Sequence, residues 1–207
     1  MTTLPDPPFL VISDRRQARL PLAATAEAAF RAGCRWFSLR EKDLPGDERR
    51  ALLRTLVGLG HRYGATVTAH EDIAAVVATG ADGVHLPGGG DPGAARRRLP
   101  SGLIGVSAHS PAEAAAQLAA GADYATLSPI FLTESKPGYG PAVGLEALAA
   151  AARLAPGPIV ALGGIGHDNV AACLAAGARG IAVMGEIMRA SDPEAAVRGL
   201  LAALGAR

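Results

Sequence analysis

The chain has 207 residues, of which 49% are hydrophobic. A chain of this length buries about 70% of its unfolded surface, so it can fold without a metal or disulfide bonds. Its 20 basic and 19 acidic residues give a net charge of +1, which argues against a nucleic-acid partner. No apolar run approaches the length of about 18 residues that a membrane span requires, and residues 1–9 lack a signal-peptide core. We therefore expect one cytoplasmic domain over residues 1–207, without a membrane partner.

Two further features could indicate a binding site, and both have simpler interpretations. The basic run from Arg96 to Arg98 is typical of a solvated helix face. Cys34 and Cys173 lack the spacing of a metal site, and we interpret them as buried thiols.

A glycine follows several predicted helices and precedes a short apolar run each time. Gly33, Gly80, Gly121 and Gly177 occupy these positions. Glycine can adopt the left-handed conformation that ends a helix, and the apolar run beyond it can join a sheet. This repeated pattern of helix, glycine and apolar run predicts a module of alternating strands and helices.

Eight short apolar segments are predicted to be parallel strands, because stretches with high helix propensity separate them. About eight such units favour a single-domain (β/α)8 barrel of the TIM type over an open doubly wound sheet. The predicted strands are 9–13, 36–40, 66–70, 83–86, 104–108, 124–128, 159–162 and 180–184.

The segment 158–186 is predicted to form a strand, a glycine loop, a helix and a second strand. Gly163 and Gly164 end the first strand, where the missing Cβ lets the backbone approach an anion. The helix is predicted to begin at residue 168 or 169, with its unpaired N–H groups beside the loop. Gly185 ends the second strand. The pattern indicates the phosphate site that barrels build after strands seven and eight, and a tight turn is the alternative.

Polar side chains follow most of the predicted strands. In a barrel they meet at the C-terminal end, where active sites lie, although this rim is solvated in any case. The long segment 129–143 is predicted to lie over the same end, and loops of that length are usually functional or mobile. The candidates are Ser13, Asp14, Arg40, Glu41, Lys42, His70, Glu71, Asp72, His85, Ser107, His109, Ser128, Thr133, Ser135 and Lys136.

Each candidate also has a structural interpretation. His85 could equally well be a core histidine that is buried and whose ring nitrogens have hydrogen-bond partners. His109 precedes a helix start at Ser110 and could simply lie near its cap. Glu71 and Asp72 suit the first turn of a helix. The functional interpretation therefore depends on their convergence at one end of the barrel.

The sequence resembles the thiamine phosphate synthase family in four ordered motifs. These are SLREK at 38–42, GVSAH at 105–109, SPIF followed by TESK within 128–136, and IVALGGI at 159–165. The resemblance covers nearly the whole chain and implies a (β/α)8 barrel that handles a thiazole phosphate. Synthase members also bind a pyrimidine diphosphate with Mg²⁺ and join the two rings with loss of pyrophosphate.

The sequence departs from the synthase pattern where Mg²⁺ would bind. Synthases carry Asn-Asp after the third strand and Gln-Glu-Asp or Gln-Asp-Asp after the fourth. This chain has His70, Glu71 and Asp72 at the first place, and three glycines followed by Asp91 at the second. Mg²⁺ requires oxygen ligands at short, strict distances. The resemblance thus implies a degraded diphosphate site at His70, Glu71 and Asp91, with no metal expected unless the protein is a synthase.

This departure favours the branch of the family that resembles TenI-type thiazole tautomerases. His109 matches its catalytic position, and a histidine can move a proton near neutral pH. Lys136 is expected either to stabilise developing charge or to close the loop. A thiamine phosphate synthase and a non-catalytic regulator that binds thiazole or thiamine phosphate are the alternatives, and a homo-oligomer remains open. The expected substrate-binding residues are Arg40, Lys42, Ser107, Thr133, Ser135, Gly163, Gly164 and Gly185.

Overall fold

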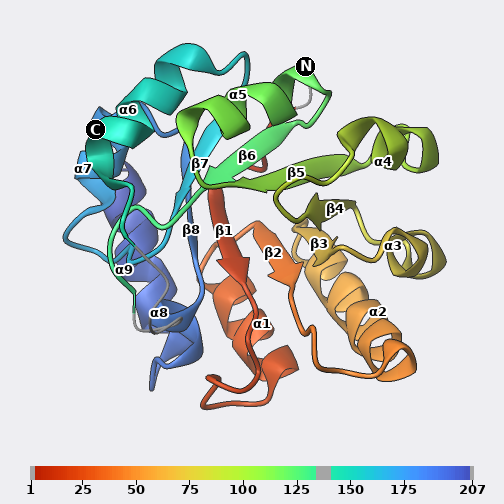
Figure 1. The fold of residues 1–207 in the computed structure, drawn as a ribbon. Helices are drawn as coiled ribbons and strands as arrows, with labels where there is room; N and C mark the ends of the chain where they lie inside the picture. Colours follow the sequence, from red (N-terminus) through yellow and green to blue (C-terminus); the bar gives the residue numbers. More distant parts are fainter. Residues whose placement is uncertain (1–2, 134–140, 206–207) are drawn as a thin grey trace.

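The computed structural model describes residues 3–133 and 141–205. Its strands form one closed parallel barrel in the order β1 to β8, with the helices outside (Figure 1). The barrel closes where Leu10 of β1 lies opposite Ala182 of β8. The prediction of a (β/α)8 barrel is confirmed against the open sheet. The strands are β1 Phe9–Ile12, β2 Trp36–Leu39, β3 Thr66–His70, β4 Gly83–Leu86, β5 Leu103–Ala108, β6 Tyr124–Leu127, β7 Ile159–Leu162 and β8 Gly180–Val183.

The helices alternate with the strands, and all the predicted strands agree with the observed ones to within one residue at either end. The four glycines predicted to end helices all have positive φ angles. The helices are α1 Leu22–Arg31, α2 Gly46–Arg62, α3 Ile73–Thr79, α4 Pro92–Arg98, α5 Pro111–Ala119, α6 Gly144–Leu154, α7 Val170–Ala175, α8 Gly185–Met188 and α9 Pro193–Gly205.

The inside of the barrel changes from apolar to polar along the strands. The apolar part includes Trp36 and Tyr124, whose ring centroids are 4.7 Å apart in an edge-on arrangement. Two residues further along β2, on the same face as Trp36, lies Ser38, opposite Thr68 of β3. Both hydroxyl-bearing residues are fully buried. A polar layer therefore begins inside the barrel toward the C-terminal ends of its strands.

Two local predictions need correction. Helix α7 begins at Val170 rather than at residue 168 or 169, because residues 167–169 form a turn. Arg96 is not part of a solvated face, since its guanidinium donates to Asp123 at 2.7 Å and to the Gly102 carbonyl at 2.8 Å. The remaining two arginines of that run are exposed.

Cys34 and Cys173 are buried free thiols, as predicted. Within the described part of the chain, no helix has the length and apolar character needed to cross a membrane.

Candidate active site

A cavity of about 500 Å³ opens at the C-terminal ends of the strands. It is lined by residues from loops all around the barrel, so the residues that follow separate strands do meet at this end, as predicted. Asp91 is not among the lining residues, and Ser135 and Lys136 lie outside the described residues. The predicted site residues that line it are Arg40, Lys42, His70, Glu71, Ser107, His109, Thr133, Gly163, Gly164 and Gly185.

His109 follows β5 and is oriented by the next strand. Its Nδ1 lies 2.9 Å from the Ser128 carbonyl oxygen. A carbonyl only accepts hydrogen bonds, so Nδ1 carries a proton and donates. In the neutral ring, Nε2 is then the basic nitrogen. The imidazole is thus held in a defined tautomer at the edge of the cavity.

Glu113 positions the backbone of His109, and the sequence interpretation missed it. Glu113 Oε2 accepts the His109 N–H at 2.8 Å, while Ser110 Oγ accepts the Glu113 N–H at 3.2 Å. The spacing of Ser110 and Glu113 matches a capping box, which is the signal that could have found it. A Cβ on Gly88 would lie 2.9 Å from Glu113 Oε1, so the glycine after β4 leaves room for this carboxylate.

His85 is both a satisfied core histidine and a lining residue. Its Nδ1 is 3.0 Å from the Tyr124 hydroxyl, and its Nε2 is 3.0 Å from Ser107 Oγ. Burial, with a smaller effect of the Arg40 charge, lowers the pKa of His85 to about 3. The ring therefore stays neutral and fixed in the floor of the cavity.

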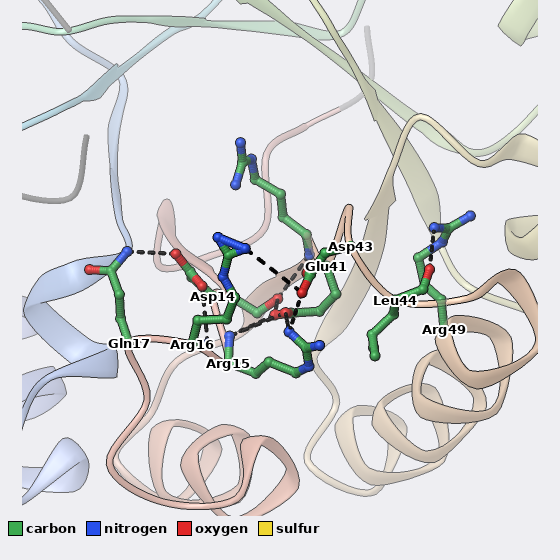
Figure 2. A network of polar contacts seen from close by, with 10 residues as sticks. Asp14, Arg15, Arg16, Gln17, Glu41, Asp43, Leu44 and Arg49 are labelled. Atoms are coloured by element: carbon green, nitrogen blue, oxygen red, sulfur yellow. Dashed lines mark hydrogen bonds and ion pairs between the residues drawn. The ribbon is translucent and has the colours of Figure 1, made fainter. Parts of the chain in front are cut away.

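The segment after β2 is anchored by Glu41, whose side chain is buried while Arg40 and Lys42 on either side line the cavity. Glu41 Oε1 accepts the Ser13 hydroxyl at 2.7 Å and the Arg15 backbone N–H at 3.0 Å (Figure 2). Ser13 Oγ in turn accepts the Arg40 N–H at 2.8 Å. Burial raises the pKa of the Glu41 carboxyl. This carboxyl group fixes the direction in which the backbone of Arg40 and Lys42 leaves the strand.

The acidic residues after β3 and β4 are engaged in different contacts. Glu71 forms an ion pair with Lys42 and has a φ angle of 65°, a left-handed conformation that few residues other than glycine adopt. Asp72 accepts the Ala75 N–H at 2.8 Å and caps α3. Asp91 caps α4 by accepting the Ala94 N–H at 2.9 Å. Glu71 is therefore the acid of this group that reaches the main cavity.

Among residues 3–133 and 141–205, there is no group of three or more His, Cys, Asp or Glu side chains that could hold a metal ion.

Gly163 and Gly164 form a sharp turn with φ angles of 97° and 63°. A Cβ on Gly163 would lie 2.7 Å from Pro129 Cα, and a Cβ on Gly164 would lie 2.5 Å from the Leu132 carbonyl oxygen. The segment after β6 thus approaches closely, and the Ile130 N–H donates to the Leu162 carbonyl at 2.9 Å. The turn and the cavity-lining role occur together, so the two interpretations of this glycine pair are compatible.

Asn169 stabilises the same loop, a role that the sequence interpretation missed. Its Nδ2 donates to the Gly164 carbonyl at 2.9 Å, and its Oδ1 accepts the Gly166 N–H at 3.0 Å. Arg189 also lines the cavity and was missed. It lies six residues beyond β8, in a stretch without a recognisable motif, so no sequence signal pointed to it.

The comparisons with known proteins agree with this geometry. A family model described as "Thiamine monophosphate synthase" matches residues 9–187. Proteins named thiamine-phosphate synthase are similar to this chain in Roseiflexus sp. (strain RS-1), at 38% identity over 94% of the chain and 84% of the relative, and in Anaeromyxobacter dehalogenans (strain 2CP-C), at 42% over 88% and 83%. The solved structure of thiamine phosphate pyrophosphorylase from Pyrococcus furiosus superposes with a TM-score of 0.86, at 31% identity over 95% of this chain and 94% of that one. A barrel whose cavity is lined by the family's motifs, together with relatives that extend over nearly its whole length, places the chain in the thiamine monophosphate synthase family of enzymes.

Proposed function

We propose that the protein is a thiamine-phosphate synthase, which joins a thiazole phosphate to a pyrimidine diphosphate with loss of pyrophosphate. The relatives above carry this name, so the synthase replaces the tautomerase as the first interpretation. The observation that carries the proposal is that one cavity connects two sectors suited to anions. Arg40 and Lys42 lie after β2, and the glycines of the phosphate loops lie after β7 and β8.

The two sectors suit two different anionic groups. The thiazole phosphate is assigned to the backbone N–H groups of Gly163, Gly164 and Gly185, where the absence of side chains allows close approach. The diphosphate is assigned to Arg40 and Lys42, because charge-assisted hydrogen bonds to phosphate oxygens are strong. Their positive charge would stabilise the pyrophosphate as it leaves. Ser107 and Thr133 are assigned to further substrate contacts, since both line the cavity.

The residues after β3 fit a Mg²⁺ ion in part. Mg²⁺ is commonly bound by one or two carboxylates together with substrate phosphate oxygens. Glu71 lines the cavity and would supply one carboxylate, whereas Asp91 is used to cap α4. Bound there, Mg²⁺ would neutralise charge on the diphosphate. Lys42, the ion-pair partner of Glu71, is the protein's own cation at the same place.

A second candidate is the thiazole tautomerase, and the geometry of His109 supports it. The Ser128 carbonyl holds the ring with its proton on Nδ1, which makes Nε2 a possible proton acceptor. In this reaction His109 would move a proton on a carboxythiazole phosphate, without a metal. Asp91 caps α4, so its carboxylate is engaged in the helix cap rather than as a metal ligand. This agrees with the second candidate, whose reaction needs no metal.

Assays of the purified full chain distinguish the two candidates. For the synthase, thiazole phosphate and pyrimidine diphosphate are supplied with Mg²⁺, and release of pyrophosphate and formation of thiamine phosphate are measured with and without EDTA. For the tautomerase, isomerisation of carboxythiazole phosphate is followed in the presence of EDTA. Joining of the rings supports the proposal, and isomerisation alone supports the second candidate. Binding of thiazole phosphate without either reaction would contradict both and indicate a regulator.

The His109→Ala variant adds a check on the second candidate. If His109 transfers the proton, isomerisation should slow by about 10²- to 10⁴-fold while thiazole phosphate binding is retained. An unchanged rate would remove His109 from that mechanism. Arg198→Gln on α9, which is not among the cavity-lining residues, is the matched control and should behave as the unaltered protein.

A further inference from the structure

Arg189 spans two loops at the opening of the cavity. It follows α8 directly and lines the cavity with Gly185. Its backbone N–H donates to the Gly185 carbonyl at 2.9 Å, which places it one helical turn from that glycine. Its guanidinium Nη1 donates to Oε1 of Gln17, in the loop after β1. The side chain therefore connects the β8 side of the opening with the β1 side.

Gln17 is held by contacts at both ends of its amide. Its Oε1 accepts a hydrogen bond from Arg189. Its Nε2 donates to Asp14 Oδ2 at 2.5 Å (Figure 2). Because the amide oxygen only accepts and the amide nitrogen only donates, these contacts define its orientation. Asp14 also accepts the Arg16 backbone N–H at 3.1 Å, which fixes the carboxylate in its loop. A chain of oriented dipoles thus leads from the Asp14 carboxylate to the Arg189 guanidinium.

The charge of the phosphate loops points to a role for this guanidinium. Backbone N–H groups carry only partial charges, whereas a phosphate monoester carries a charge of about −1.5 to −2 at pH 7. Among the described lining residues, the Arg and Lys side chains are Arg40 and Lys42 after β2, and Arg189 beside the β8 glycine. The first two belong to the sector assigned to the diphosphate. Of these three described lining side chains, Arg189 is therefore the full positive charge that lies beside the β8 glycine.

We propose that Arg189 is a substrate-binding residue that contacts the phosphate of the thiazole substrate, and that Gln17 and Asp14 are positioning residues for its guanidinium. An arginine is suited to this role because its planar fork can donate two hydrogen bonds to one phosphate. The inference rests on the proposed function in taking a thiazole phosphate as the ligand.

The first experiment compares binding of three ligands to the full chain by calorimetry. The ligands are the thiazole phosphate, the corresponding thiazole alcohol and inorganic phosphate. In Arg189→Gln, affinity for the thiazole phosphate should fall by about 10- to 100-fold, because a charged contact is lost, while affinity for the alcohol stays unchanged. Arg198→Gln removes an arginine on α9 that pairs with Glu194 and should leave all three affinities unaltered. An equal loss for the phosphate and the alcohol would overturn the inference, since it would indicate a structural role.

The second experiment tests positioning. Gln17→Leu keeps the charge of Arg189 but removes both amide contacts, so we expect a loss of about 3- to 10-fold for the phosphate ligand only. Arg189→Lys should retain part of the affinity that Arg189→Gln loses. In the Arg189→Gln background, Gln17→Leu should add nothing, because the two residues act as a unit. Additive losses would refute the positioning role of Gln17.

The ligand set separates failure of this inference from failure of the proposed function. If the unaltered chain and Arg189→Gln bind thiazole phosphate equally, the inference is wrong and the proposed function stands. If the unaltered chain binds no thiazole phosphate, the proposed function is contradicted. In that case, binding of inorganic phosphate that is lost in Arg189→Gln would still support Arg189 as an anion contact, and binding unaffected by the variant would refute it.

Discussion

At His85, burial and a neighbouring positive charge act in the same direction. They lower the pKa of the imidazole to about 3, whereas an exposed histidine titrates near 6.5. The unfolded chain therefore binds one more proton than the folded chain between these values. The stability from this group is fully present above pH 6.5 and is lost as the pH falls, by up to about 1.4 kcal/mol per pH unit.

The His85→Gln variant tests this linkage, since glutamine can still hydrogen-bond to Tyr124 and Ser107. Between pH 7.5 and pH 5, the free energy of unfolding should fall by about 2 kcal/mol more in the unaltered protein than in the variant. Urea unfolding can be followed by the fluorescence of Trp36, the single tryptophan. The same pH dependence in both proteins would show that His85 does not take up the proton.

The glycine loop offers a matched pair of substitutions. Gly163→Ala places a methyl group 2.7 Å from Pro129 Cα at a φ angle of 97°, so we expect destabilisation by about 1–3 kcal/mol. Gly166→Ala, in the same loop, meets no atom within 4 Å and should change stability by less than about 0.5 kcal/mol. Chemical denaturation measures both. Equal effects would mean that close packing against the β6 loop does not require glycine at position 163.

At the scale of elements, Glu41 connects the ends of β1 and β2. Glu41→Ala would leave the Ser13 hydroxyl and the Arg15 N–H without their acceptor, and should lower the free energy of unfolding by about 1–3 kcal/mol. Asp43→Ala is the control, because Asp43 pairs with Arg15 on the exposed side, where solvent screens the pair, and its loss should have a much smaller effect. Thermal and urea unfolding provide the comparison. A larger loss for Asp43→Ala would contradict the anchoring role of Glu41.

The elements themselves were predictable because both faces of every strand are covered. Short apolar segments separated by alanine-rich helices define such strands, and the observed bounds agree with the predicted ones to within one residue. The start of α7 was missed because Asn169 bonds back to the glycine loop instead of entering the helix. That preference depends on where Gly164 lies, and helix propensity contains no such information.

For the whole molecule, the cavity exists only when the barrel is closed, because residues from loops after β2 through β8 line it. Thiazole phosphate should therefore bind the folded chain alone and stabilise it. At a ligand concentration of 100 times Kd, the gain is about 2.7 kcal/mol, or about 5–10 °C in Tm for a chain of this size. Differential scanning calorimetry measures the shift, with the thiazole alcohol as the control. No shift at saturating thiazole phosphate would contradict its binding to this cavity.

The barrel, the strand ends and the family were predictable from the sequence alone, because they depend on local periodicity and on motifs whose residues are contiguous. Predicted site residues line the cavity at or after β2, β3, β5, β6, β7 and β8. Only the tertiary structure revealed that Asp91 caps a helix, that Glu113 holds His109 and that Gln17 holds Arg189. Gln17 and Arg189 are separated by 172 positions in sequence. Such partners are specified by the closure of β1 against β8, and contacts across that closure leave no periodic signal in the chain.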